Sequence, residues 1–139
     1  MEQLSVNIAA RTYPAALPSA VGKNFIDLVP ADFEQREFGE DYDFTFVLRF
    51  PTIGEERNIE GMVDREFRKA NFPDSRSQIG TLAYDVEYAI ALVATLASKD
   101  ADLPAWFGHN ARSTTLNRYA IAEVGRAFRE MADLKKKNT

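Results

Sequence analysis

Alternating apolar and polar positions indicate two β-strands near the start of the chain. Leu4, Val6 and Ile8 alternate with polar or small neighbours, which predicts a short strand. The stronger signal lies in residues 42–50, where every second side chain is large and apolar. We expect this strand to end at Pro51, which has no amide hydrogen to donate, and to turn one face to the core: Tyr42, Phe44, Phe46, Leu48 and Phe50.

The segment between these strands has a weaker pattern. Residues 11–29 contain Pro14, Pro18 and Gly22, which predict a loop or extended chain. Residues 25–29 are apolar enough for a second short strand that ends before Pro30, and the charged residues 31–40 favour neither helix nor strand.

Three helices are expected after residue 54. Thr52 and Glu55 have the capping-box spacing, so a helix is predicted over about 54–70. Ser75 and Gln78 have the same spacing ahead of a helix that reaches about Ser98. Ser113 or Thr114 is expected to cap the last helix, which runs to about Leu134.

These elements predict an α+β fold, with short N-terminal β segments followed by a bundle of about three α-helices. A chain of 139 residues fits a single domain, 1–139. Within it we expect an extended β region over 1–54, a helical region over 55–134 and a frayed basic tail over 135–139.

Composition excludes several kinds of site. The chain has no cysteine and one histidine, so disulfides, thiolate nucleophiles, cysteine-bound zinc and two-histidine sites are absent. A pI near 5.1 argues against a nucleic-acid partner. The N-terminus does not resemble a signal peptide, and the longest apolar run, 88–97, is half of the ~20 residues that a membrane span needs. These patterns predict a cytosolic protein without a membrane partner.

No motif predicts a catalytic, cofactor-binding or metal-binding site. His109 has Asp100 and Asp102 nearby, but their spacing matches no ligand pattern, so we interpret it as a loop histidine. A cluster of carboxylates precedes the strong strand and could act as acid and base or bind a hard cation. A charged turn explains the same residues more simply: Glu37, Glu40, Asp41 and Asp43.

The net charge of −4 hides an uneven distribution. Residues 27–60 hold ten acidic and three basic side chains, a net charge of −7, whereas residues 118–139 hold six basic and three acidic ones, a net charge of +3. A solvated surface explains this distribution, and head-to-tail self-association or docking of a basic partner are the alternatives.

Aromatic residues supply the candidates for partner binding. Trp106 and Phe107 follow Pro104 in a polar connection, where they form either a plug over the helices or an exposed anchor for a partner. The second and third predicted helices also carry apolar residues outside the stripe that faces the core. Such a second apolar face is explained either by burial of the helix on two sides or by binding of a partner. Among these positions we select three tyrosines as candidates: Tyr84, Tyr88 and Tyr119.

Two short motifs and the order of elements resemble a known family. The motifs are Arg49-Phe50-Pro51-Thr52-x-Gly54-Glu55 after the strand and Asp102-Leu103-Pro104-x-Trp106 before a final helix with Leu116, Tyr119 and Phe128. Over residues 42–134 the chain resembles the tail assembly chaperones of long-tailed bacteriophages.

The resemblance implies a non-enzymatic protein of the host cell cytoplasm. Such chaperones bind the long helical tape measure protein, keep it soluble and assist assembly of tail tube protein around it, and an apolar groove for amphipathic helices suits that role. Another virion morphogenesis component, such as a head–tail connector or tail-terminator subunit, is the alternative. A small enzyme that uses the acidic cluster is a third hypothesis.

Overall fold

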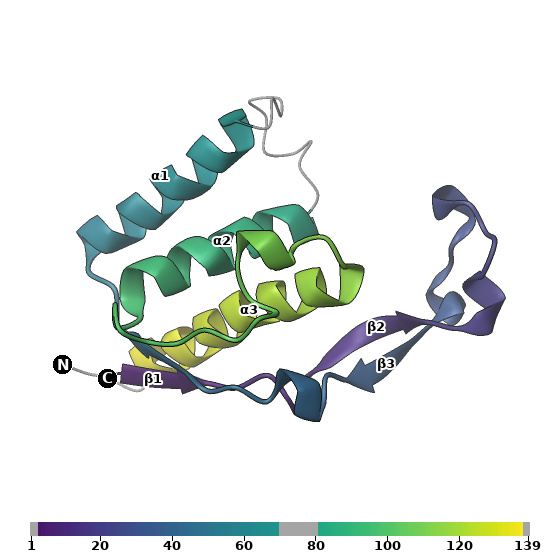
Figure 1. Ribbon diagram of the computed structural model, residues 1–139, viewed down its shortest axis with the longest axis horizontal. Helices are drawn as coiled ribbons and strands as arrows, with labels where there is room; N and C mark the ends of the chain where they lie inside the picture. Colours follow the sequence, from purple (N-terminus) through teal and green to yellow (C-terminus); the bar gives the residue numbers. More distant parts are fainter. Residues whose placement is uncertain (1–2, 70–80, 138–139) are drawn as a thin grey trace.

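The computed structural model describes residues 3–69 and 81–137, and it has the predicted α+β architecture (Figure 1). The strands are β1 (Gln3–Val6), β2 (Thr12–Ala16), β3 (Phe33–Glu37) and β4 (Phe46–Arg49). The α-helices are α1 (Ile53–Lys69), α2 (Thr81–Leu96) and α3 (Thr115–Lys137). Short 3₁₀ turns occupy Pro18–Ala20, Phe25–Asp27, Pro30–Asp32, Glu40–Tyr42 and His109–Ala111.

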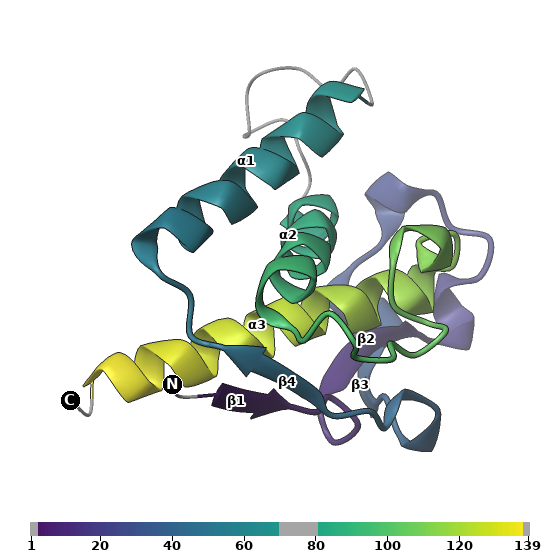
Figure 2. The same cartoon turned by 60° about the vertical axis from the view of Figure 1, so that its left-hand side comes forward.

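The strands form a two-segment antiparallel ribbon. β1 pairs with β4 in the register Leu4↔Leu48, and β2 pairs with β3 in the register Pro14↔Gln35. Between the two segments the amide of Gly39 donates to the carbonyl of Ala9 at 2.8 Å, so the two chain paths stay together. The β1–β4 pair lies against α2 and α3, while the far end of the β2–β3 hairpin projects beyond the helices (Figures 1 and 2).

The strand predictions are confirmed in part. Leu4, Val6 and Ile8 are buried as expected. The strong strand is shorter than predicted, because residues 40–42 form a 3₁₀ turn and pairing with β1 begins only at Phe46.

Two further strand predictions were incomplete or wrong. The extended chain expected after residue 11 includes a true strand, β2, and the ambiguous segment 31–40 contains its partner β3. The strand expected at 25–29 is wrong. A 3₁₀ turn forms there because the amide of Asp27 donates to the carbonyl of Asn24 at 2.9 Å.

The helix predictions agree more closely. Glu55 N donates to Thr52 Oγ1, and Thr52 N donates to Glu55 Oε1, both at 3.1 Å, so the first capping box is confirmed. Thr114 caps α3, since its hydroxyl accepts the amide of Asn117 at 3.2 Å. The second capping box, Ser75 to Gln78, lies outside the described residues.

The end of the last helix differs from the prediction. α3 continues to Lys137 instead of ending near Leu134, so residues 135–137 are not frayed. Lys135 lies 5.7 Å from the ring centroid of Phe50, and Lys136 Nζ lies 3.8 Å from Glu56 Oε1. These contacts and the favourable position of cations at a helix C-terminus explain the extra turn.

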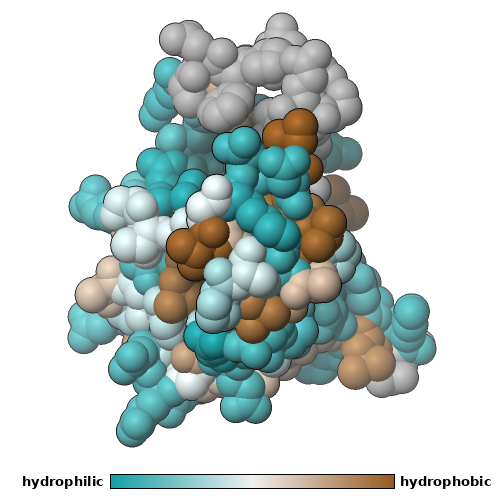
Figure 3. Space-filling view, turned by 90° about the vertical axis from the view of Figure 1, so that its right-hand side faces the viewer, coloured by the Kyte–Doolittle hydropathy of each residue, from teal (hydrophilic) through white to brown (hydrophobic). Residues whose placement is uncertain are grey.

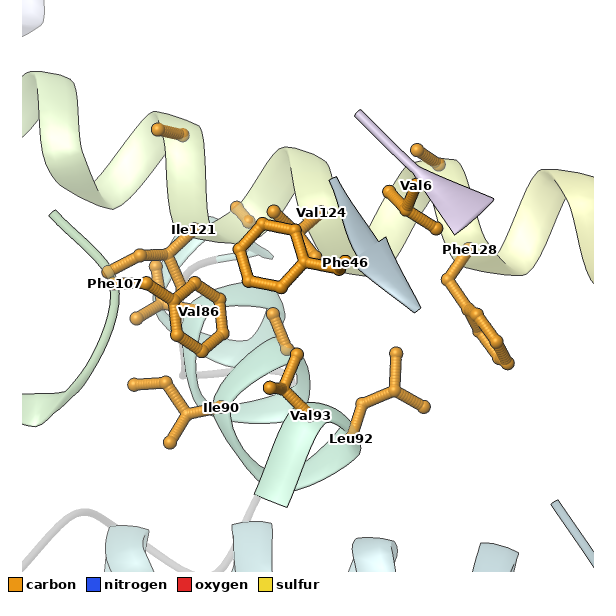
Figure 4. Close-up of a cluster of buried hydrophobic side chains, with 14 of the residues drawn as sticks. Val6, Phe46, Val86, Ile90, Leu92, Val93, Phe107, Ile121, Val124 and Phe128 are labelled. Carbon is orange, nitrogen blue, oxygen red and sulfur yellow. The ribbon is translucent and has the colours of Figure 1, made fainter. Parts of the chain in front are cut away.

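One hydrophobic core joins the ribbon to the helices (Figure 4). Its labelled members come from the inner strands, from α2 and α3, and from the connection between these helices: Val6, Phe46, Val86, Ile90, Leu92, Val93, Phe107, Ile121, Val124 and Phe128. Helix α1 adds Ile59, Val63 and Phe67. The extra apolar positions Leu92 and Ile121 are therefore explained by two-sided burial. No described helix has both the length and the apolar character required to cross a membrane.

Candidate functional site

A wide groove of about 560 Å³ runs along α1 and is bounded by one tyrosine of α2. We call it the helical groove. Its lining combines apolar, acidic and basic side chains: Ile53, Glu56, Arg57, Ile59, Glu60, Gly61, Asp64 and Tyr88.

The spacing of residues along α1 explains the character of this groove. Glu56, Glu60 and Asp64 are four residues apart, so they follow one line along the helix. Ile53, which is 71 % exposed, begins a neighbouring line that continues through Arg57 and Gly61. The groove therefore presents an exposed apolar side chain beside a row of carboxylates.

Tyr84 and Tyr88 connect α2 to the two helices beside it. The hydroxyl of Tyr84 donates to Glu60 Oε1 at 3.1 Å, and its ring stacks between Phe67 and Tyr88 at centroid distances of 6.5 and 6.3 Å. The guanidinium of Arg129 on α3 lies 4.5 Å from the ring centroid of Tyr88. Both predicted tyrosines are thus half-buried at this side of α2, and Tyr88 lines the groove itself.

The acidic and basic segments of the chain meet at one end of the groove. Lys136 of α3 lies 3.8 Å from Glu56 of α1. Arg126 of α3 instead pairs with an acid outside the acidic segment, since its Nε lies 3.1 Å from the buried Asp85 of α2. The uneven charge seen in the sequence therefore contributes an ion pair between α1 and α3 and also gives the α1 side of the groove its carboxylates.

The first family-like motif forms the junction between β4 and α1. The guanidinium of Arg49 donates to both oxygens of Glu55, at 3.2 and 2.7 Å, and to the carbonyl of Thr95 at 3.0 Å. The hydrogen bond from Arg49, followed by that from the amide of Thr52, lowers the pKa of Glu55 from its ordinary 4.5. These contacts fix the direction in which α1 leaves the strand, and α1 carries most of the groove.

Trp106 and Phe107 lie in the core and not on an exposed surface. Trp106 is 9 % exposed and packs against Tyr42 and Phe46, at centroid distances of 5.2 and 5.7 Å, and Phe107 lies 5.1 Å from Phe46. These contacts bury both rings in the core. The interpretation of Trp106 and Phe107 as an exposed anchor for a partner is therefore wrong. The plug interpretation fits the packing.

The other sequence candidates lie away from the helical groove. Tyr119 is half-buried on α3, where its ring faces Tyr13 of the β2–β3 hairpin at 6.4 Å. The four acidic residues of the predicted cluster are all exposed along the ribbon, and Asp43 accepts a hydrogen bond from Asn7 at 2.7 Å. The structure thus brings Tyr84 and Tyr88 together and keeps Tyr119 apart from them.

His109 lies close to two carboxylates that the sequence did not connect with it. Glu66 of α1, Glu87 of α2 and His109 have ligand atoms within 4.8 Å of one another. Asp100 and Asp102, the neighbours in sequence, are exposed and are not part of this group. The three residues come from separate elements, so no sequence spacing could have predicted the group.

A second apolar surface lies at the end of the β2–β3 hairpin, which we call the hairpin tip (residues 17–32). Val21 and Ile26 are 82 % and 85 % exposed, and Val29 is also exposed. Figure 3 looks at the molecule from this side and shows apolar patches separated by hydrophilic atoms. Asp32 fixes the base of the tip by accepting from the amide of Val29 at 3.0 Å and from Lys23 at 3.1 Å.

Sequence reasoning did not select the acidic row of α1 or the hairpin tip. The four-residue spacing of Glu56, Glu60 and Asp64 is a signal that could have revealed the row. Ile26 and Val29 of the tip were instead interpreted as part of a short strand, and Val21 as part of a loop or extended chain.

Comparisons with protein-family models, curated proteins and solved structures give no match for this chain.

Proposed function

We propose that this chain is a tail assembly chaperone of a long-tailed bacteriophage, a non-enzymatic protein that binds the tape measure protein in the host cytoplasm. The helical groove is the observation that carries the proposal. It offers an exposed apolar side chain, Ile53, and half-buried Tyr88 beside the carboxylates of α1. An amphipathic helix with an apolar stripe and basic flanking residues complements such a surface.

The motifs that resemble the family support the same proposal. Arg49 and Glu55 set the start of α1, and Trp106 anchors the connection between α2 and α3. Both motifs therefore build the scaffold on which the groove lies. In this proposal the chain covers apolar stripes of the tape measure helix until tail tube protein replaces it.

Co-expression tests this proposal. The full chain and the tape measure protein encoded with it are produced together, and the soluble fraction and the co-purified complex are measured. We expect the tape measure protein to be insoluble with an unrelated small acidic protein and soluble with this chain. An unchanged soluble fraction without a complex would contradict the proposal.

The hairpin tip favours a second candidate function, a subunit of the virion itself. Exposed apolar side chains such as Val21 and Ile26, on a hairpin that extends from the body, suit insertion into a neighbouring subunit of a ring. Mass spectrometry of purified particles separates the two functions. A connector or terminator subunit is retained in the particle, whereas an assembly chaperone is absent from it.

A further inference from the structure

Three elements direct ligand groups into one pocket beside α1, away from the helical groove. Glu66, Glu87 and His109 have ligand atoms within 4.8 Å of one another, and Glu87 Oε2 lies 4.0 Å from His109 Nδ1. The same three residues line a pocket of about 220 Å³ together with Met62 and Ile90. A carboxylate pair and an imidazole therefore face a space large enough for an ion and water.

Glu87 is the unusual member of this group. The residue is only 7 % exposed, and its Oε2 atom is buried without a hydrogen-bond partner among the residues that the structure describes. Leaving a buried carboxylate oxygen unpaired is costly, so such an atom requires an explanation. An ion held between Oε2 and the nearby imidazole supplies one.

Arg112 orients the carboxylate of Glu87 and holds the backbone of His109. Its Nη1 atom donates to Glu87 Oε1, and its Nε atom donates to the backbone carbonyl of His109 at 3.0 Å. The arginine therefore satisfies one oxygen of Glu87 and leaves the other directed toward the imidazole. Hydrogen bonds of this kind orient the ligands of protein metal sites.

We propose that Glu66, Glu87 and His109 bind a divalent transition-metal ion, with Zn²⁺ as the best match. Imidazole and carboxylate are ligands of Zn²⁺, and three protein ligands leave a fourth position for water. Ligand atoms of a tetrahedral zinc lie about 3.4 Å apart, given metal–ligand distances of about 2.0–2.2 Å. Because Glu66 is half-buried and His109 is exposed, their side chains can rotate inward to close the present 4.0–4.8 Å separations.

Nearby cations reduce the affinity of this site. Arg112 pairs with Glu87, Lys69 Nζ lies 3.6 Å from Glu66 Oε1, and Arg65 lines the pocket. We therefore expect binding in the micromolar range, weaker than that of a structural zinc site. The bound ion links the C-terminal part of α1 to α2 and to the connection that carries Trp106.

Calorimetric titration of the full chain, stripped of metal with a chelator, tests the site directly. We expect one Zn²⁺ per chain and, at a hundredfold excess over the dissociation constant, an increase in Tm of about 5–10 °C. Because His109 is the only histidine, its NMR signals report on this site alone and should broaden when Co²⁺ is added.

Variants distinguish a three-residue site from binding at a lone histidine. Glu66→Gln removes a ligand that is not buried and should weaken Zn²⁺ binding at least about tenfold while the metal-free Tm stays near that of the wild type. Asp102→Asn, which removes an exposed carboxylate from the same connection as His109, is the matched control and should bind like the wild type.

Any one of three results would contradict the proposed site. They are the absence of Zn²⁺ binding, a Zn²⁺ affinity of Glu66→Gln equal to that of the wild type, and a loss of affinity in Asp102→Asn as large as that in Glu66→Gln. None of them bears on the proposed chaperone function, which uses the helical groove.

Discussion

Two glycines in the helices have opposite surroundings. A Cβ atom added at Gly61 on α1 would meet nothing within 4 Å, whereas one added at Gly125 on α3 would lie 3.2 Å from Ala89 Cβ and 3.3 Å from Tyr88 Cδ1. Gly125 therefore allows the close approach of α3 to α2. Gly61 has no such packing role among the described residues.

Alanine at these two positions should have opposite effects on stability. Gly61→Ala should raise the free energy of unfolding by about 1 kcal/mol, because alanine favours the helix and meets no obstruction. Gly125→Ala should lower it by about 1 kcal/mol, because Ala89 belongs to a packed helix and cannot move away. Urea unfolding followed by circular dichroism measures both. Equal stabilisation by the two substitutions would contradict the packing described here.

The ion pair at the start of α1 should make stability depend on pH. The pKa of Glu55 is lowered in the folded protein, so its contribution is present above the ordinary value of 4.5 and is lost as the pH falls through the folded pKa. Glu55→Gln retains the capping-box pattern but removes the charge. The difference in unfolding free energy between wild type and Glu55→Gln should therefore be present at neutral pH and shrink in acid.

Arg49→Gln supplies the control for this effect. Without the guanidinium, the change from Glu55 to Gln should have a smaller effect on stability at neutral pH. If the effect of Glu55→Gln were the same at every pH, or the same in both backgrounds, the ion pair would not be its cause.

At the scale of elements, the connection between α2 and α3 is a structural part of the core. Trp106→Ala should lower the free energy of unfolding by about 3–5 kcal/mol, because it leaves a cavity beside Tyr42 and Phe46. Leu103→Ala, in the same connection but exposed, should change it by no more than about 0.5 kcal/mol. Circular dichroism during denaturation measures both variants, and a small effect of Trp106→Ala would exclude the plug interpretation.

Local signals predicted the elements well. The reciprocal bonds of Thr52 and Glu55 need only neighbouring residues, so their spacing sufficed to predict the start of α1. The alternation of apolar and polar residues predicted the buried face of β1, because this pattern also depends only on residues close together in the sequence. The apolar residues 25–29 do not form the predicted strand, because a strand needs a partner. Among the described residues none pairs with this segment, and a 3₁₀ turn forms at Phe25–Asp27 instead.

Contacts between distant segments could not be predicted in this way. β2 contains Pro14 and β3 is highly charged, so neither has a strong strand pattern, and their pairing becomes visible only in the ribbon. The group of Glu66, Glu87 and His109 likewise depends on three elements that meet in space. The sequence pattern indicated Tyr84 and Tyr88 as candidates for partner binding. It could not indicate that they lie beside the acidic row of α1.

At the scale of the whole molecule, two surfaces compete as the docking site for a partner. The helical groove presents Ile53 beside the carboxylates of α1, and the hairpin tip presents Val21 and Ile26 on the far end of the ribbon. A basic amphipathic helix complements the groove better, because three carboxylates line the groove, whereas Asp32 of the tip already pairs with Lys23. If it binds there, its affinity should fall as salt is added, because the carboxylates and the basic partner are screened.

The most direct test of the proposed function is the affinity of the purified chain for helical segments of the tape measure protein encoded with it. Ile53→Ser removes the apolar side chain from the groove without adding a charge and without harming the fold, because Ile53 is exposed. Ile26→Ser makes the same change at the hairpin tip. We predict that Ile53→Ser weakens binding at least about tenfold and that Ile26→Ser binds like the wild type. Wild-type binding by Ile53→Ser, or a loss confined to Ile26→Ser, would contradict the account.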